Sequence, residues 1–352
     1  MALDVHVNID RIRDVMTNTL EIRCQNLIVD LGLGQAGDVQ DVTALTGGVA
    51  SDIASVVVNG ARYCVKFALP KLKVAADWQA PVHRNAAEYA WLTVAADLSP
   101  DSAVKLFGRS EPAHGFVMEY IAGDDVYLWK SAMLDGRPLR GEAQAVGDML
   151  GRIHAASAQA GFDTSAFQNR DDFRALRIEP YLTFTAQVHP DLADTLNAMA
   201  EALYENANVL VHGDVSPKNI LIRDGTPILL DAECATMGDA SFDPAFCLNH
   251  LILKAIHVPA LRTDLLTAVG AFWGAYRAHI SWEDAASLET RVARLLPALM
   301  LARVDGKSPV EYLDDAGREQ IRNLAVSVLK NPISRISELV KIIKTELKEE
   351  PA

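Results

Sequence analysis

The sequence has 352 residues, of which half are apolar and 22% are charged, and its 46 Asp and Glu outnumber its 33 Lys and Arg. At roughly 100–200 residues per domain, this length predicts about two domains, and the apolar content excludes a disordered chain. The net charge of −13 argues against nucleic acid or an anionic membrane as a partner, because both bind clustered Lys and Arg.

The cysteines and the apolar runs indicate the kind of compartment. Cys24, Cys64, Cys234 and Cys247 lie far apart and match no zinc-ligand spacing, so we expect buried, reduced thiols. The N-terminus lacks a basic stretch followed by an apolar run, and no segment approaches the ~18 uncharged apolar residues of a membrane span. We therefore expect a cytoplasmic protein without a membrane partner.

The first third of the chain predicts a helical leader followed by a small antiparallel sheet. Asn59-Gly60 between two β-branched runs is a strong hairpin signal, and nothing in this region requires a parallel crossover. The expected elements, in chain order, are one or two helices within 7–31, strands over 42–46, 53–58 and 61–67, a helix over 82–96 and a strand over 116–121.

From residue 125 onward the apolar spacing is mostly helical. Helices are expected over 143–155, 191–206, 246–257, 261–278, 287–302, 316–329 and 333–347, and short strands over 209–214, 220–223 and 227–231. The sequence therefore predicts an α+β protein of two lobes with a hinge near 120–124. The N-terminal lobe would be 1–121, with a leader over 1–40, and the helical C-terminal lobe would be 122–352.

The densest chemical signal is His-Gly-Asp-Val-Ser-Pro-Lys-Asn-Ile-Leu over 212–221, with Leu-Leu-Asp ending at Asp231. Phosphoryl transfer from ATP needs a carboxylate to orient the attacking hydroxyl, and an amide oxygen and a second carboxylate to hold Mg²⁺. Asp214, Asn219 and Asp231 supply these groups, and the five-residue step from Asp214 to Asn219 matches the D-x-x-x-x-N spacing of kinase catalytic loops.

These motifs resemble the aminoglycoside phosphotransferase and choline kinase superfamily, whose members have a protein-kinase-like fold. The resemblance implies a bilobal protein with ATP between the lobes. Carried over by position, Asp214 is the catalytic base, and Asn219 and Asp231 are the Mg²⁺ ligands. Ser216 stands where a histidine is frequent, and Lys218 where a small residue is, so the approach of the substrate differs here.

The first lobe carries the matching nucleotide-binding pattern. The loop over 46–52, with Gly47, Gly48 and Ser51, joins two strands and would cover phosphates with its backbone N–H groups. Lys66, at the end of the third strand, occupies the position of the kinase lysine that contacts the α/β-phosphates. Glu88 is its expected ion-pair partner, with Glu111 as the competitor. The hinge segment Glu119, Tyr120 and Ile121 would meet the adenine.

Two segments resemble one subfamily in particular, the 5-methylthioribose kinases. These are Val-Lys-Phe-Ala-Leu-Pro-Lys over 65–71 and Asp-Ala-Glu-Cys-Ala-Thr-Met-Gly over 231–238, the latter followed by Phe242-Asp243. The resemblance implies that Glu233 assists Asp231 at the metal and that Asp243 stabilises the catalytic loop. Pro217 and Asn219 follow the aminoglycoside kinase pattern instead, which leaves the subfamily open.

Other polar residues have structural interpretations. His212 is expected to orient backbone and His154 to be a hydrogen-bonded core histidine. Arg303 and Lys307 lie in the half where the superfamily builds its acceptor site, and are either substrate contacts or surface residues. The G-x-G-x-x-G over 32–37 is followed by strands rather than by a helix, which argues against a dinucleotide-binding domain.

We therefore expect an ATP- and Mg²⁺-dependent phosphotransferase that acts on a hydroxyl of a small molecule. A 5-methylthioribose kinase is the alternative among enzymes, and a catalytically silent nucleotide-binding protein is the alternative among non-enzymes. Protein kinase activity is disfavoured, because the stretch after Asp231 leaves little length for an activation loop. Either a monomer or a homodimer is compatible with the amphipathic terminal helix.

Overall fold

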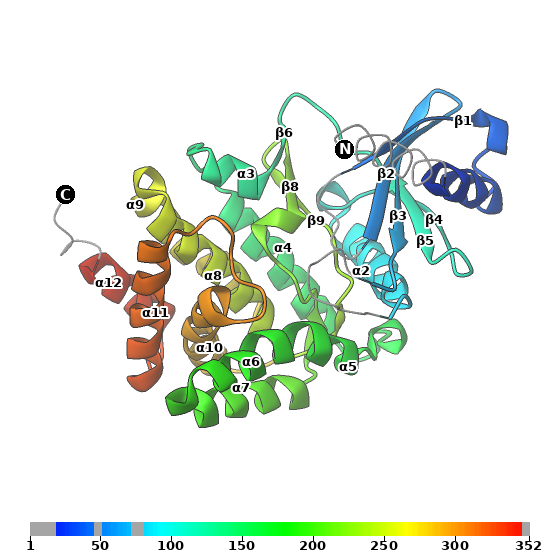
Figure 1. The fold of residues 1–352 in the computed structure, drawn as a ribbon. Helices are drawn as coiled ribbons and strands as arrows, with labels where there is room; N and C mark the ends of the chain where they lie inside the picture. Colours follow the sequence, from blue (N-terminus) through cyan, green and yellow to red (C-terminus); the bar gives the residue numbers. More distant parts are fainter. Residues whose placement is uncertain (1–18, 46–50, 72–80, 347–352) are drawn as a thin grey trace, which may run out of the picture. The chain divides into compact units, whose positions relative to one another are not determined.

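A computed structural model describes residues 19–45, 51–71 and 81–346 of the chain (Figure 1). Its backbone contacts divide the chain into two compact units. The first unit comprises the described residues up to Thr93 together with Val104–Ala122, and the second comprises Val94–Ala103 together with the chain from Gly123 onward. The division therefore falls within helix α2 (Arg84–Leu98).

The first unit is built on a five-stranded antiparallel sheet with strand order β1-β2-β3-β5-β4. The strands are β1 (Val39–Ala44), β2 (Ser51–Val58), β3 (Ala61–Ala68), β4 (Leu106–Ser110) and β5 (Gly115–Glu119). Four of them were predicted, although β1 begins three residues earlier than expected. The edge strand β4 was not predicted, because Leu106–Ser110 is short and contains Gly108.

The β2–β3 hairpin forms at the predicted turn. Asn59 and Gly60 have φ of 52° and 82°, the left-handed conformations that a two-residue hairpin turn of this type requires. This turn sets the register in which Lys66 on β3 pairs with Ile53 on β2, and β5 pairs with the other side of β3 at Phe116. Lys66 therefore lies on a central strand.

A helix over 19–30 covers one face of this sheet and builds its core. Cys24, Leu27 and Ile28 are fully buried and belong to one apolar cluster with Val65 and Phe67 of β3. The predicted leader is thus helical over 19–30, whereas its end carries the turn η1 (Ala36–Asp38) and the start of β1. Residues 1–18 lie outside the described residues.

The second unit is mostly helical, as predicted. Its helices are α3 (Trp129–Leu134), α4 (Glu142–Ser157), α5 (Arg170–Phe173), α6 (Phe184–Val188), α7 (Ala193–Glu205), α8 (Phe242–His257), α9 (Arg262–Arg277), α10 (Ala285–Asp305), α11 (Asp315–Lys330) and α12 (Ile336–Glu346). Together with the antiparallel sheet of the first unit, they confirm the α+β fold class.

The short helices α3, α5 and α6 were not predicted, and neither was a longer helical segment between α5 and α6. The π-helix η4 (Arg174–Thr183) runs without interruption between α5 and α6. It contains Pro180, which lacks the backbone N–H that an ordinary helical turn uses, and such i→i+5 segments are rare and frequent at functional sites. The proline and the unusual period explain why a search for α-helical spacing passes over it.

Short strands organise the middle of the second unit. Strand β8 (Ile220–Arg223) pairs with β6 (Val126–Leu128) and β9 (Thr226–Leu229), and β7 (Val209–Val211) pairs with β10 (Thr236–Gly238). The loop after β7 leads through the turn η6 (Pro217–Asn219) into β8. This topology places the predicted catalytic loop between two small sheets.

Among the described residues, no single helix has the length and apolar content to span a membrane. Helix α8 and the following segment Pro259–Arg277 meet those criteria only as a pair, which is bent by 118°.

Candidate active site

The predicted catalytic loop is held together by hydrogen bonds among its own residues. Asp214 is 3% exposed, and its backbone carbonyl accepts hydrogen bonds from the Asn219 side-chain amide at 3.1 Å and from the Ser216 N–H at 2.7 Å. The Asn219 carbonyl in turn accepts from the Leu230 N–H at 2.8 Å. The turn therefore holds Asp214 and Asn219 together and ties them to the strand that leads into Asp231.

Two cations contact the Asp214 carboxylate. Arg177 Nη2 lies 3.0 Å and Lys218 Nζ 3.2 Å from Oδ2, whereas no described residue donates to Oδ1. Burial alone would raise the pKa of Asp214, but the charges of Lys218 and Arg177 outweigh it and hold this pKa well below its usual value. Asp214 is therefore an ionised hydrogen-bond acceptor with one carboxylate oxygen to which no described residue donates.

Arg177 comes from the unpredicted π-helix and also supports the loop backbone. Its Nε donates to the Gly213 carbonyl at 2.5 Å and its Nη1 to the Leu176 carbonyl at 2.8 Å. Sequence reasoning missed Arg177, because it lies 37 residues before Asp214 and no motif spacing connects the two. Lys218, noted only as a departure from the superfamily, is the second cation.

Asp243 and two histidines stabilise this loop through hydrogen bonds to its backbone and to one another. Asp243 is fully buried, and its carboxylate accepts from the backbone N–H groups of His212 at 2.6 Å and Gly213 at 2.9 Å. Burial lowers the pKa of His212, and its neutral Nδ1 accepts from the Asp214 N–H at 3.1 Å. His154 reaches Asp243 at 3.4 Å and the Tyr276 hydroxyl at 2.7 Å. These contacts confirm the structural roles expected for the three side chains.

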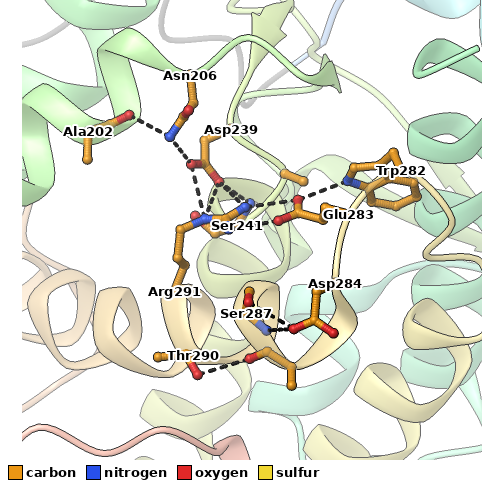
Figure 2. A network of polar contacts seen from close by, with 12 residues as sticks. Ala202, Asn206, Asp239, Ser241, Trp282, Glu283, Asp284, Ser287, Thr290 and Arg291 are labelled. Carbon is orange, nitrogen blue, oxygen red and sulfur yellow. Dashed lines mark hydrogen bonds and ion pairs between the residues drawn. The ribbon is translucent and has the colours of Figure 1, made fainter.

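A separate ionic network holds the chain just before Asp243 (Figure 2). Asp239 is 2% exposed and accepts from Asn206 Nδ2 at 2.8 Å, and from the Ser241 N–H at 2.8 Å. Arg291 bridges Asp239 at 3.3 Å and Glu283 at 2.7 Å, as Figure 2 shows. The network therefore anchors the first turn of α8, which carries Asp243.

The predicted metal ligands have the chemistry that Mg²⁺ prefers. Asn219 and Glu233 are 8% and 7% exposed, and Asp231 is half-buried with φ of 68°. The charge of Asp231 helps to raise the pKa of Lys218, after that of Asp214, so Asp231 lies within electrostatic range of the catalytic loop. One amide and two carboxylate oxygens form a hard donor set that fits Mg²⁺.

In the first unit, Lys66 and Glu88 form the ion pair expected from the sequence. Their Nζ and Oε1 atoms are 2.7 Å apart, and both side chains are 3% exposed. Ser51 at the start of β2 is buried, whereas Gly47 and Gly48 lie outside the described residues. Glu111, the competing partner, is exposed.

The predicted hinge residues occupy the end of β5 and the segment after it. Glu119 is the last residue of β5, and its backbone N–H donates to the Lys105 carbonyl at 2.8 Å. The Arg62 guanidinium carbon lies 5.6 Å from the centre of the Tyr120 ring, and Ile121 is half-buried. Their contact with adenine stays a prediction.

Comparison with known proteins identifies the family. Residues 41–282 match the sequence profile described as the phosphotransferase enzyme family. Methylthioribose kinases from Citrobacter koseri and Erwinia tasmaniensis are 22% and 24% identical to matched segments that cover 61% and 57% of this chain. The matches span 62% and 56% of those proteins, less than two thirds of their length.

Two solved structures share the fold at low identity. The choline kinase from Cryptosporidium parvum is 11% identical with a TM-score of 0.55, and 92% of this chain and 99% of that chain are covered. An amicoumacin kinase in complex with AMP-PNP, Ca²⁺ and Ami is 14% identical with a TM-score of 0.50, and 91% and 97% are covered. These structures show the shared fold, and the profile match over most of the sequence shows that the chain belongs to the phosphotransferase enzyme family.

Proposed function

We propose that this protein is a kinase that transfers the γ-phosphate of ATP to a hydroxyl of a small molecule, with Asp214 as the catalytic base. The observation that carries the proposal is the Asp214 carboxylate, which is ionised, held at Oδ2 by two cations and free of described donors at Oδ1. A base with a low pKa suits phosphoryl transfer, where the loose transition state needs orientation of the hydroxyl more than early proton removal.

The remaining predicted residues would hold the nucleotide. Asn219 and Asp231, assisted by Glu233, would bind Mg²⁺, which when present neutralises charge on the phosphates. Lys66, oriented by Glu88, would contact the α/β-phosphates, and the loop with Gly47, Gly48 and Ser51 would cover them. Glu119, Tyr120 and Ile121 would meet the adenine. The lobe 1–121 would thus bind ATP, and 122–352 would bind the acceptor. The AMP-PNP and Ca²⁺ named for the amicoumacin kinase support a nucleotide and a divalent cation in this fold.

Methylthioribose is a second candidate acceptor. The matches to curated methylthioribose kinases and the Asp231–Gly238 segment favour it. We further propose a cytoplasmic enzyme that acts as a monomer or a homodimer, with neither nucleic acid nor a membrane as a partner.

The test of the function compares two Asp→Asn substitutions in ADP-release assays over a panel of hydroxylated metabolites and aminoglycosides. Asp214→Asn should lower kcat by about 10³-fold or more while nucleotide binding persists, because only the orienting charge is removed. Asp224→Asn is the matched control, since Asp224 is exposed in the β8–β9 turn at φ of 50°, a conformation that Asn tolerates.

Undiminished turnover in Asp214→Asn would refute the mechanism. Tight binding of Mg·ATP without ADP release over the whole panel would instead support the catalytically silent alternative. Selective turnover of methylthioribose would establish the second candidate.

A further inference from the structure

Helix α8 carries a lysine buried without a counter-ion. Lys254 is fully buried, and it makes no hydrogen bond or ion pair to any residue within 19–45, 51–71 or 81–346. Its Nζ lies 5.0 Å from the centre of the Tyr312 ring. Burial, and then the charges of Lys130 and Arg303, lower the pKa of Lys254 to about 7. Burial of an uncompensated cation is costly, which suggests a function in binding.

Arg303 at the end of α10 is the second cation of this cluster. Its Nη1 donates to the Tyr181 hydroxyl at 3.2 Å and to the Ser308 hydroxyl at 3.1 Å, whereas its buried Nε has no partner among the described residues. It forms no ion pair with a described carboxylate. The Tyr312 hydroxyl is likewise buried without a described partner. Two cations and one hydroxyl therefore have unused donors in one region.

Two helical faces connect this cluster to the catalytic loop. On α8, Phe246, His250 and Lys254 follow one another at four-residue steps, and the Phe246 ring packs on that of Tyr181 at 5.5 Å. On the π-helix, Tyr181, which contacts Arg303, follows Arg177, which contacts Asp214, after four residues. The charges of Asp214 and Arg303 both act on the pKa of His250. The cluster and the proposed base thus both lie within electrostatic range of His250.

Resting on the proposed kinase function, we propose that the phosphate acceptor carries an anionic group, a carboxylate or a phosphate, which binds to Lys254 and Arg303 while the acceptor hydroxyl meets Asp214. The described carboxylates nearby are already engaged. Glu311 pairs with Lys130, and Asp214 pairs with Arg177 and Lys218. An anion would therefore supply the missing counter-charge, whereas a cationic acceptor would meet two like charges.

The first experiment compares matched acceptors in ADP-release assays with Mg·ATP and the full chain. The pairs are gluconate with glucitol, glycerate with glycerol, and glucose 6-phosphate with glucose, and methylthioribose and choline serve as neutral and cationic references. We expect kcat/KM to be about 30-fold or more higher for an anionic member than for its neutral counterpart. The carboxylate and phosphate pairs distinguish the two sources of the anion.

The second experiment removes the charge with Lys254→Met, with Lys341→Met on the exposed side of α12 as the control. Lys254→Met should raise the acceptor KM by about 30-fold or more while the KM for ATP stays within about twofold. It should also raise the melting temperature of the free protein, because an uncompensated buried charge is lost. Lys341→Met should change none of these values.

The outcomes separate this inference from the kinase function. ADP release only with neutral or cationic acceptors would overturn the inference and leave the kinase function intact, and so would a change confined to the KM for ATP. A lower melting temperature with an unchanged acceptor KM would assign a structural cation–π role to Lys254.

If no compound supports ADP release, the kinase function fails. A rise in melting temperature with gluconate but not with glucitol, lost in Lys254→Met, would then still support the anion site, and no such rise would overturn it.

Discussion

Two buried charged residues of the second unit, Asp214 and Lys254, differ in whether opposite charges compensate them. Asp214 is contacted by two cations, Lys218 and Arg177, and their charges hold its pKa low. Lys254, on α8, lies over the Tyr312 ring and pairs with no described carboxylate. A buried charge with opposite charges beside it is compatible with a stable fold. A buried charge without them lowers the folding stability of the protein, and a bound ligand of opposite charge restores it.

The pKa of Lys254 makes stability depend on pH in a defined direction. The native pKa is about 7 and the ordinary value is 10.5, so between these values the unfolded chain holds a proton that the native chain lacks. Stability from this residue therefore rises with pH through that window. Between pH 7 and 8.5, the free energy of unfolding of the native sequence should gain about 1.5–2 kcal/mol relative to Lys254→Met.

Urea denaturation of both proteins at several pH values measures this difference. The groups that face Lys254 are Lys130 from α3, Arg303 from α10, Cys247 and His250 from its own helix, and Glu311 and Tyr312 from the loop after α10. Subtracting the variant cancels groups that titrate alike in both proteins. Parallel curves for the two proteins across pH 7–8.5 would contradict a neutral Lys254 at alkaline pH.

At the level of elements, the predicted catalytic loop depends on a close approach between the turn after β7 and the segment after Asp231. Gly213 has φ of 80°, and a Cβ at that position would lie 2.9 Å from Cys234 Cβ and 3.0 Å from the Cys234 carbonyl oxygen. Backbone atoms cannot move aside as a flexible side chain can. Only glycine therefore fits between the loop that carries Asp214 and the segment that carries Asp231.

Gly213→Ala and Gly225→Ala separate steric crowding from backbone strain. Gly225 has a similar φ of 77° but no atom within 4 Å of its added Cβ. Gly225→Ala should cost about 1 kcal/mol of folding free energy, from the left-handed conformation alone. Gly213→Ala should cost about 1–3 kcal/mol more, because of overpacking, and should also lower kcat.

Thermal or chemical unfolding measures both costs, and ADP release measures activity. Equal destabilisation by the two substitutions would show that the loop and the Cys234 segment do not need this close approach.

At the scale of the whole molecule, net charge and local charge have opposite signs. The chain carries −13, which suits a cationic acceptor if read alone. Around Lys254 the described charges are instead mostly positive, since Lys130 and Arg303 act on it together with Glu311. Neighbours within a few ångströms govern a buried site, because distant surface charges are screened by solvent and salt.

The four free thiols are all buried, so their reactivity can be used to follow the unfolding of each unit separately. Cys24 and Cys64 lie in the first unit, and Cys234 and Cys247 lie in the second. The smaller first unit buries a smaller fraction of its surface, so its thiols should become reactive at lower urea concentration. Thiol labelling with peptide mass spectrometry across a urea gradient measures this order, and coincident labelling of all four would instead show that the units unfold together.

The sequence alone determined most of the longer elements and the reaction class. The Asn59-Gly60 turn, the helical periods and the step from Asp214 to Asn219 are local patterns, and local backbone preference decides them. Lys66 with Glu88, and Asp243 with the catalytic loop, could also be anticipated, because the motif order along the chain follows a known family. The π-helix was not predicted, because its period differs from that of an α-helix and it contains a proline.

Tertiary structure decided which charges meet. Arg177 reaches Asp214 from 37 residues away, and Lys254, Arg303 and Tyr312 come together only when α8, α10 and the loop after α10 pack. No spacing rule joins these residues, since contact between distant segments depends on how helices pack and not on sequence separation. The sequence therefore identified the phosphotransferase family and predicted its site residues, whereas the cationic character of the proposed acceptor site, opposite in sign to the whole chain, follows from packing alone.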